Sequence, residues 1–334
     1  MMDEHMHALP VVRCVDIIAP EPSLQDNTAD LDRLKKVLSP VVRNEFGSRL
    51  LNIPFRYMKD VAASFREAGF RGSAVLNVLP GLIDIVDFPP AMPEMLPGMA
   101  LDLGTTHLEA TLVDLLTGEK LAHAHAVNRQ IEYGADILSR IHFATRLQEN
   151  ESGLAVLQQA VVASIDALAA ELARSAGVEV DEIRALSVSG NTTMVHLLLG
   201  FSPYHICREP YIPLVNAPDP FTSGEIGLRI NAAAPVWVLP SIGSYFGGDL
   251  ISGILSSGLD TKKTTSMLID VGTNAEVVLG NSDWLIACAG AAGPALEGGV
   301  AKMGMRAGPG AIEHVRLDTK QWRLDYQTID EASA

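Results

Sequence analysis

The chain has 334 residues, of which 48% are hydrophobic and 19% are charged, so it can bury the cores of two or more domains and does not have the composition of a disordered protein. Its net charge of −15 excludes a general nucleic-acid-binding protein, because neutralising phosphates requires clustered cations, but it allows a nucleotide held by backbone amides and a metal ion. The N-terminus lacks a signal-peptide pattern and Gly, Pro or charged residues interrupt the apolar runs, so we expect a soluble cytoplasmic protein with no membrane-spanning part.

The first part of the chain predicts a small α/β domain. A turn or linker signal follows its first strand, at residues 20–23, and a stretch rich in Pro and Gly at 89–98 marks its end. The predicted elements are a strand at 11–18, helices at 26–38 and 57–68, a strand at 73–78, and a segment at 82–86 that fits either a strand or a helix.

After residue 98 the pattern becomes a β-meander followed by alternating helices and strands, which indicates an α/β fold. The helix that begins near residue 192 has Thr192 or Thr193 as its predicted cap, and Gly177 is the predicted C-cap of the helix before it. The predicted elements are strands at 99–106 and 108–115 and from 120, helices at 134–149 and 153–175, a strand at 185–188, a helix at 192–199, a loop at 202–220, a strand at 236–239 and a helix at 249–257.

A weak internal repeat is the most informative feature of the sequence. Residues 100–106 and 268–274 are both apolar strands that end in Asp, an apolar residue, Gly and Thr, and each is followed by another strand. The glycine allows a tight turn, exposed N–H and Thr hydroxyl groups can bind phosphate oxygens, and the Asp can hold Mg²⁺ through water. Either copy alone fits a plain β-turn better, but two copies in matching register favour a polyphosphate gripped from both sides.

These hairpins resemble phosphate-1 and phosphate-2 of the actin, sugar kinase and heat-shock ATPase superfamily, and over nearly the whole chain the sequence resembles the reductive activators of corrinoid proteins. The last of the motifs that carry this resemblance is quite specific, whereas Asp-x-Gly-Thr alone is not. The motifs are PEPSLQDNTADLDRL (20–34), LDLGTTHLEATLVD (101–114), YGADILSRI (133–141), SVSGNTTMVHLLLG (187–200), LIDVGTNAEVVLG (268–280) and AAGPALEGGVAKMGMRAGPGAIE (291–313).

The resemblance implies a protein that couples ATP hydrolysis to the reduction of a Co(II) corrinoid protein to Co(I). Its cofactors would be ATP and Mg²⁺, its partners a corrinoid protein and a low-potential electron donor, and its state a homodimer. The implied organisation is a linker at 1–28, a small α/β middle domain at 29–95, a first actin-like (ribonuclease-H-like) ATPase lobe at 96–262 and the beginning of a second, incomplete lobe at 263–334. The implied phosphate-site residues are Asp102, Gly104, Thr105, Thr106, Asp270, Gly272, Thr273 and Asn274, and the implied Mg²⁺ ligands are Asp102 and Asp270.

The sequence departs from the family pattern in two ways. It begins in the linker, and Cys14, Cys207 and Cys288 are too far apart to ligate the [2Fe–2S] cluster expected in the family. It also ends before the Gly-Gly adenosine motif of the second lobe, since Gly298-Gly299 follows Asp270 too soon. We therefore expect an internal piece of an activator that binds ATP weakly by itself.

Other candidate residues each have two interpretations. Asn191 and Thr192 follow a strand and open a helix, so they fit both an anion contact and a helix cap. Asp249 fits both a catalytic residue that orients Mg²⁺ or the attacking water and an N-cap. For the remaining residues we favour structural interpretations: a solvated strand face for His123 and His125, a helix cap for Asp136, close packing for Gly293-Pro294 and Glu297-Gly298-Gly299, core or interface packing for Met303 and Met305, and a terminal tail for His5 and His7.

Two other functions remain open at this point. A phosphotransferase of the sugar-kinase type would use Asp249 as a base for a substrate hydroxyl, although a sugar-pocket pattern is missing. A non-catalytic nucleotide-binding or dimerisation module would bind nucleotide without turnover. Stimulation of ATP hydrolysis by a corrinoid protein, sugar-stimulated ADP release, and binding without turnover would distinguish the three functions.

Overall fold

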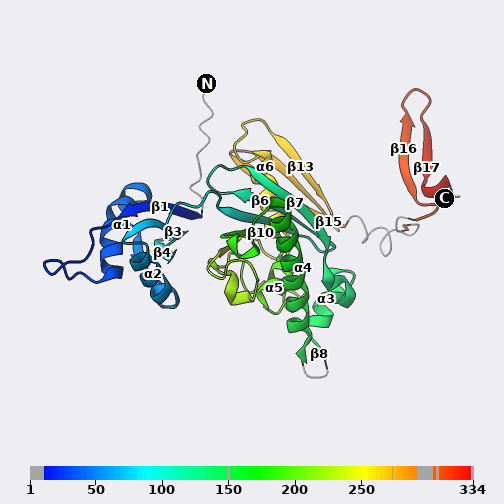
Figure 1. The fold of residues 1–334 in the computed structure, drawn as a ribbon. Coiled ribbons are helices and arrows are strands. Elements are labelled where there is room, and N and C mark those ends of the chain that lie inside the picture. Colours follow the sequence, from blue (N-terminus) through cyan, green and yellow to red (C-terminus); the bar gives the residue numbers. More distant parts are fainter. Residues whose placement is uncertain (1–10, 149–150, 273, 292–303, 306–307, 332–334) are drawn as a thin grey trace. The chain divides into compact units, whose positions relative to one another are not determined.

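The computed structural model describes residues 11–148, 151–272, 274–291, 304–305 and 308–331. The chain divides into two compact units, Met1–Asp249 and Leu250–Ala334, and each is described by itself below. Figure 1 shows both as ribbons coloured along the sequence. The elements confirm the expected α/β class.

A four-stranded sheet with the order β1-β3-β4-β2 forms the first part of the first unit. Strand β1 pairs antiparallel with β3, so residues that we expected in a linker form the edge strand of this sheet. The ambiguous segment at 82–86 is the strand β4, because it pairs with β3 on one side and β2 on the other. The elements are β1 (Val12–Ile18), α1 (Asp30–Phe46), β2 (Leu50–Asn52), α2 (Phe55–Glu67), β3 (Arg71–Leu79) and β4 (Leu82–Asp87).

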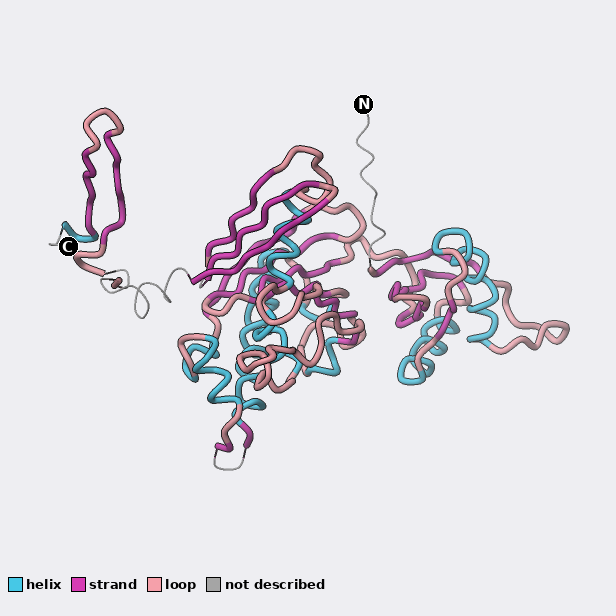
Figure 2. Tube along the Cα trace, turned by 180° about the vertical axis from the view of Figure 1, so that it is seen from behind, coloured by secondary structure: helices cyan, strands magenta, loops and turns pink. Residues whose placement is uncertain are grey.

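The two faces of this sheet have different partners. The helices α1 and α2 cover one face and bury Leu34, Phe65 and Leu76 in a common core (Figure 2, cyan helices). On the other face, Val12 and Val75 belong to a second apolar cluster, which also contains Leu96, Ala185 and Ala233 from the following domain. The small domain therefore packs against its neighbour within the first unit.

A six-stranded sheet with the order β11-β12-β10-β5-β6-β7 forms the second part of the first unit. Strands β5, β6 and β7 form the predicted antiparallel meander, and β10 pairs parallel with both β5 and β12. The carboxyl ends of three parallel strands therefore lie next to one another. The strands are β5 (Pro97–Leu103), β6 (His107–Asp114), β7 (Lys120–Val127), β10 (Leu186–Gly190), β11 (Phe221–Thr222) and β12 (Pro235–Val238).

Short elements and helices follow the meander, and the helices at 137–144, 153–176 and 192–199 share one core with the sheet. Helix α4 ends at Gly177, which has a φ of 70° and caps the helix as predicted. The predicted helix at 134–149 is shorter, because the Asp136 cap starts it at Ile137 and a turn and a short strand follow Ala144. The elements are η1 (Arg129–Tyr133), α3 (Ile137–Ala144), β8 (Leu147–Gln148), β9 (Glu151–Ser152), α4 (Gly153–Ala176), η2 (Val180–Glu182), α5 (Thr192–Leu199), η3 (Ser223–Ile226) and α6 (Gly248–Ser257).

Helix α4 corrects one expectation from the sequence. Among the described residues it is the one helix long and apolar enough to cross a membrane, with a mean hydropathy of 1.5 in its most apolar window, although we expected no such segment. Leu157, Val161 and Ile165 of this helix are completely buried in the core of the six-stranded sheet. A long apolar helix in the core of a folded domain passes the same test as a membrane span, so this finding is weak support for a span.

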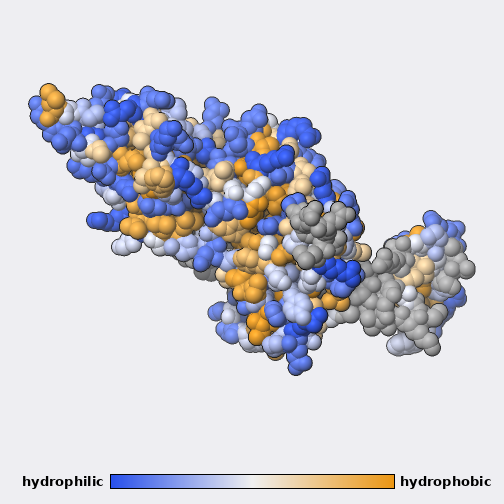
Figure 3. Space-filling view, turned by 90° about the horizontal axis from the view of Figure 1, so that it is seen from below, coloured by the Kyte–Doolittle hydropathy of each residue, from blue (hydrophilic) through white to orange (hydrophobic). Residues whose placement is uncertain are grey.

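The second unit contains a three-stranded antiparallel sheet and a separate hairpin. Met267, Ile269 and Val271 alternate along β13 and all three are more than half exposed. Apolar side chains also reach the surface elsewhere, as the orange areas of Figure 3 show. The elements are β13 (Ser266–Val271), β14 (Asn274–Asn281), β15 (Trp284–Ala291), β16 (Ile312–Asp318), β17 (Arg323–Thr328) and η5 (Ile329–Glu331).

Candidate functional site

The predicted site residues of the first unit gather at the carboxyl ends of β5, β10 and β12. The turn at 104–106 follows β5, Asn191 follows β10, and the segment that ends in Asp249 follows β12. Because β10 lies between β5 and β12 and runs parallel to both, these three segments leave the same edge of the sheet. In open α/β sheets, ligands bind outside the carboxyl ends of the strands.

Gly104 makes the turn after β5 possible. A Cβ atom on Gly104 would lie 2.2 Å from the carbonyl oxygen of His107, which is closer than real atoms approach. Just before this turn, the exposed Asp102 lies opposite Glu109 on β6 and Ser189 on β10. Two like charges directly opposite each other destabilise an antiparallel pair, so a cation bound here would relieve the repulsion.

The carbonyl groups of this turn all have donors in the body of the domain. The Asn128 side chain donates to the Gly104 oxygen (N···O 3.0 Å), and the Asn128 backbone N–H donates to the Thr106 oxygen (2.9 Å). The Arg140 guanidinium donates to the Thr105 oxygen (2.6 Å). In a trans peptide the N–H points opposite to the carbonyl, so the N–H groups of Thr105, Thr106 and His107 point away from these donors. Successive N–H groups that point one way form an anion-binding surface.

Asn191 connects this turn to helix α5. Its side-chain oxygen accepts the N–H of Met194 (O···N 3.0 Å), and its side-chain nitrogen donates to the Thr105 hydroxyl (N···O 3.0 Å). Asn191 is therefore the N-cap of α5. The cap that we predicted, Thr192 or Thr193, lies inside the helix instead. The buried Thr192 hydroxyl donates to the Gly243 carbonyl (3.0 Å), so Thr192 holds the loop that follows β12.

Gly247 allows the segment after β12 to approach Asn191 closely. A Cβ atom on Gly247 would lie 2.4 Å from the Asn191 Cα atom and 2.5 Å from the Oδ1 atom of Asp249. Asp249 itself lies in the first turn of α6, which begins at Gly248, so it is not the N-cap that we considered. The structure thus brings the Asp249 carboxylate close to Asn191 and, through Asn191, to Thr105.

The second unit repeats the backbone arrangement of the first hairpin. Strands β13 and β14 pair antiparallel, and Asp270 lies opposite Glu276 just before the turn, as Asp102 lies opposite Glu109. Gly272 lies in this turn and is exposed. Thr273 lies outside the described residues, and for Asn274 only the backbone, at the start of β14, is described. That the two hairpins grip one ligand stays a prediction.

The remaining sequence predictions have mixed outcomes. His123 and His125 are exposed on β7 as expected, and His123 Nε2 lies 3.3 Å from a carboxylate oxygen of Glu109. Asp136 caps α3 in a capping box with Ser139, also as expected. The described residues contain no group of three or more His, Cys, Asp or Glu side chains placed to hold a metal ion. The residues that lie outside the described part are His5, His7, Gly293, Pro294, Glu297, Gly298, Gly299 and Met303, whereas Met305 is described and is 48% exposed.

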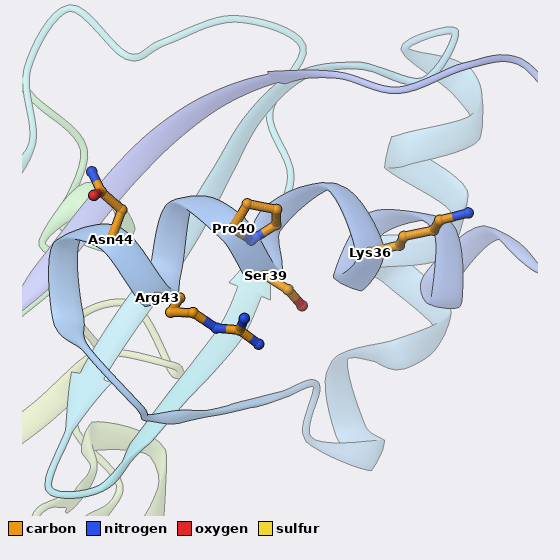
Figure 4. A pocket seen from close by; sticks show the side chains of 5 residues that line it. All are labelled: Lys36, Ser39, Pro40, Arg43 and Asn44. Atoms are coloured by element: carbon orange, nitrogen blue, oxygen red, sulfur yellow. The ribbon is translucent and has the colours of Figure 1, made fainter.

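From the sequence we did not identify three residues that shape the site. Arg140 and Asn128 lie far from the repeat along the chain, and Gly247 lies in a glycine pair whose contact with Asn191 only the fold creates. Arg140 belongs to the motif YGADILSRI, which is the one signal that could have drawn attention to it. A surface pocket of about 540 Å³ lies elsewhere, on α1, and Lys36 and Arg43 line it (Figure 4).

Three family models match the chain. The "RACo linker region" matches residues 2–88, the "RACo middle region" matches residues 97–262, and the "C-terminal domain of RACo the ASKHA domain" matches residues 264–334. The names differ from the labels we gave, since the linker model includes the small α/β domain that we labelled the middle domain. The domain limits that we predicted remain a prediction.

Individual relatives have similar descriptions. The chain is 30% identical over 327 residues to the "Corrinoid activation enzyme RamQ" of Eubacterium limosum, covering 97% of this chain and 52% of that protein. It is 26% identical over 236 residues to the "[Co(II) methylated amine-specific corrinoid protein] reductase" of Methanosarcina barkeri, covering 68% of this chain and 42% of that protein. The chain therefore spans about half the length of the curated relatives it matches.

A solved structure also resembles the chain over most of its length. The "Reductive activator for corrinoid,iron-sulfur protein" matches with a TM-score of 0.77 and 36% identity, covering 96% of this chain and 50% of that one. Together with the family model that matches residues 264–334, this similarity confirms the expected actin-like architecture.

Proposed function

Because the chain belongs to the RACo family of reductive corrinoid activators, we propose that it is the nucleotide-binding portion of an activator that couples ATP hydrolysis to the reduction of a Co(II) corrinoid protein to Co(I). The observation that carries this proposal is the repeated hairpin, in which an Asp opposite a Glu precedes a Gly-containing turn in each unit. Such a turn offers N–H donors to phosphate and carboxylates to a hydrated cation.

The residues of the first hairpin fit a magnesium nucleotide. Gly104 makes room for close backbone contact, and the N–H groups of Thr105 and Thr106 point away from the Asn128 and Arg140 donors, so they could donate to phosphate oxygens. Asp102 is exposed beside the turn and can bind Mg²⁺ through water molecules. Bound Mg²⁺ would neutralise phosphate charge and offset the repulsion between Asp102 and Glu109.

The second hairpin and Asp249 complete the proposal. Asp270, Gly272, Thr273 and Asn274 would bind the phosphates and Mg²⁺ as their counterparts in the first hairpin do. Asp249, which lies close to Asn191, would orient the attacking water by accepting its hydrogen bond. Asn191 would contact the nucleotide through its Thr105-bound amide, whereas the Thr192 hydroxyl already binds Gly243 and would act by holding that loop.

The proposed function also implies partners for this protein. The protein acted on would be a corrinoid protein in the cytoplasm, since the relatives' names describe corrinoid activation and corrinoid-protein reduction. The electron would come from a low-potential donor outside this chain, because Cys14, Cys207 and Cys288 lie on separate elements or loops and are all free. We also propose that the activator works as a homodimer.

The first test is a calorimetric titration of the chain with the Mg²⁺ complex of a non-hydrolysable ATP analogue. We expect weak binding, and we expect the double substitution D102N/D270N to reduce the affinity at least tenfold. The control D219N/D283N removes the same two charges from exposed positions outside the site and should leave the affinity unchanged. Equal affinity in the wild type and D102N/D270N would contradict the phosphate site.

A second measurement separates binding from turnover. ATP hydrolysis by the chain is followed with and without a Co(II) corrinoid protein. Stimulation by the corrinoid protein is the expected result. Binding without any turnover would instead favour a non-catalytic nucleotide-binding module, and sugar-stimulated ADP release would favour a phosphotransferase.

A further inference from the structure

Arg140 is completely buried although it carries a full charge, and none of the described atoms that accept its hydrogen bonds belongs to a carboxylate. Its Nε donates to the Gly134 oxygen (2.9 Å), and its Nη1 donates to the side-chain oxygen of Gln130 (3.2 Å) and the Met194 sulfur (3.2 Å). Its Nη2 donates to the Thr105 oxygen at 2.6 Å, the shortest of the four contacts. Burying an ionised side chain costs free energy, so its retention requires an explanation.

These contacts connect three elements at the site. Gln130 and Gly134 belong to η1 and its C-cap, Met194 lies in the first turn of α5, and Thr105 lies in the turn after β5. The N-cap of α5, Asn191, donates to the side-chain hydroxyl of the same Thr105. One guanidinium therefore sets the position of the turn relative to the helix that carries Asn191.

The hydrogen bond to Thr105 also affects the opposite side of the peptide. The carbonyl of Thr105 and the N–H of Thr106 belong to one planar group, so a cation on the oxygen makes that N–H a stronger donor. A hydrogen bond from a charged donor has about twice the effect of a neutral one. The Thr106 N–H points away from Arg140, on the side where a phosphate would bind.

We propose that Arg140 is a positioning residue for phosphate binding, which holds the 104–106 turn through the Thr105 carbonyl and polarises the Thr106 N–H toward the nucleotide. This proposal rests on the proposed function, because it assigns the ligand of the turn to a nucleotide phosphate. Burial lowers the pKa of Arg140 to about 10, so the side chain is still charged at neutral pH. The negative charge of Asp136, in the same sequence motif, favours the charged form of Arg140.

The chain offers a matched control in Arg33. This arginine is also buried, and its guanidinium donates to the backbone oxygens of Pro20, Asp26 and Thr28 in the small domain. It also forms an ion pair with the Asp26 carboxylate. The substitution R33K therefore removes a buried guanidinium that holds a loop, but a loop that carries no part of the proposed phosphate site.

The experiment compares the wild type, R140M, R140K and R33K. In the protein without nucleotide, NMR gives the Thr106 amide proton shift and the hydrogen-exchange rate of the Asn128 amide, which donates to the Thr106 oxygen. For R140M we expect an upfield Thr106 shift and at least tenfold faster Asn128 exchange, with α4 amides unchanged. R140K keeps the charge and should lie between R140M and the wild type, and R33K should match the wild type.

Calorimetry then gives the affinity of each variant for the Mg²⁺ complex of the ATP analogue. We expect at least a tenfold loss for R140M, a smaller loss for R140K and none for R33K. A folded R140M with wild-type Thr106 shift and Asn128 exchange would overturn the proposal, as would exchange that rises equally in α4. If the wild type binds no analogue, the proposed function fails, whereas the two NMR measurements still decide whether Arg140 positions the turn.

Discussion

Gly104 is required for space and not for its backbone conformation. Many other glycines of this chain adopt a positive φ in turns and caps, whereas Gly104 is required because the His107 oxygen occupies the place of a side chain. The close approach of these two backbone segments allows a four-residue connection between Leu103 and Leu108. The geometry of the predicted phosphate turn therefore requires a residue without a Cβ atom at position 104.

The substitution G104A tests this requirement. Moving the His107 carbonyl away should cost at least about 2 kcal/mol of unfolding free energy, because overpacking of this kind forces backbone shifts. It should also abolish binding of the ATP analogue. Urea unfolding and calorimetry measure the two effects.

The control for this substitution is G253A in helix α6. A Cβ atom there would lie 3.4 Å from a methyl group of Leu268, which is an ordinary contact. We expect unchanged nucleotide affinity and a stability gain of up to about 1 kcal/mol, since alanine favours helices. A G104A protein as stable as the wild type would show that the turn tolerates a side chain.

Helix α5 is held at both of its ends by polar side chains. Asn191 caps its N-terminus, and the completely buried His196 joins its last turn to the loop that follows. The His196 Nδ1–H group donates to the Thr192 oxygen (2.7 Å), and Nε2 accepts the N–H of Leu214 (3.1 Å). This pattern requires the neutral imidazole, because a protonated Nε2 could not accept.

The free energy of unfolding should therefore depend on the charge of His196. Burial lowers its pKa below the ordinary value of 6.5, so the unfolded chain takes up a proton at higher pH than the folded chain does. The contribution of His196 is fully present above about pH 6.5 and is lost as the pH falls from there through the folded-state pKa.

Urea unfolding between pH 8 and pH 5, at roughly half-unit steps, measures this dependence. The comparison with H196N isolates the histidine, since asparagine does not titrate and other groups contribute equally to both proteins. We expect the stability difference between the two proteins to shrink toward acid pH. A constant difference would mean that His196 titrates alike in the folded and unfolded states.

The small domain and the six-stranded-sheet domain form one unit in this chain. Asn77 of β3 donates a buried hydrogen bond to the Ala233 oxygen (2.8 Å), and Arg184 forms an ion pair with Asp87 (2.8 Å). Val12 of β1 and Val75 of β3 belong to one apolar cluster with residues of the neighbouring domain. We expect the two domains to unfold in one cooperative transition.

The substitution N77A tests this coupling. It leaves the Ala233 oxygen buried without its side-chain donor, which should cost about 1–3 kcal/mol. The midpoint of unfolding should fall by the same amount whether it is followed with a probe in the small domain or with one in the six-stranded sheet. The control N52A removes a hydrogen bond to Asp84 within the small sheet, away from the neighbouring domain. Two separate transitions in N77A, or a shift confined to the small domain, would contradict the coupling.

Local patterns in the sequence were sufficient for much of the fold and for the prediction of a candidate site. The meander, helix α4 with its Gly177 cap, and the Asp136 cap follow from periodicity and capping chemistry, which act within a few residues. The two hairpins were recognisable because Asp, Gly and Thr have the same chemistry wherever the chain places them.

Contacts between distant segments were decided by the tertiary structure alone. The sequence predicted a strand at 11–18 but not that this strand, β1, pairs with β3, about 60 positions away. It also gave no reason to connect Arg140 with Thr105, or Gly247 with Asn191, because these contacts exist only once β5, β10 and β12 lie side by side. Residue types and spacing along the chain predicted what the turn can bind, whereas the packing of buried polar groups from other elements determined how its carbonyls and N–H groups are oriented.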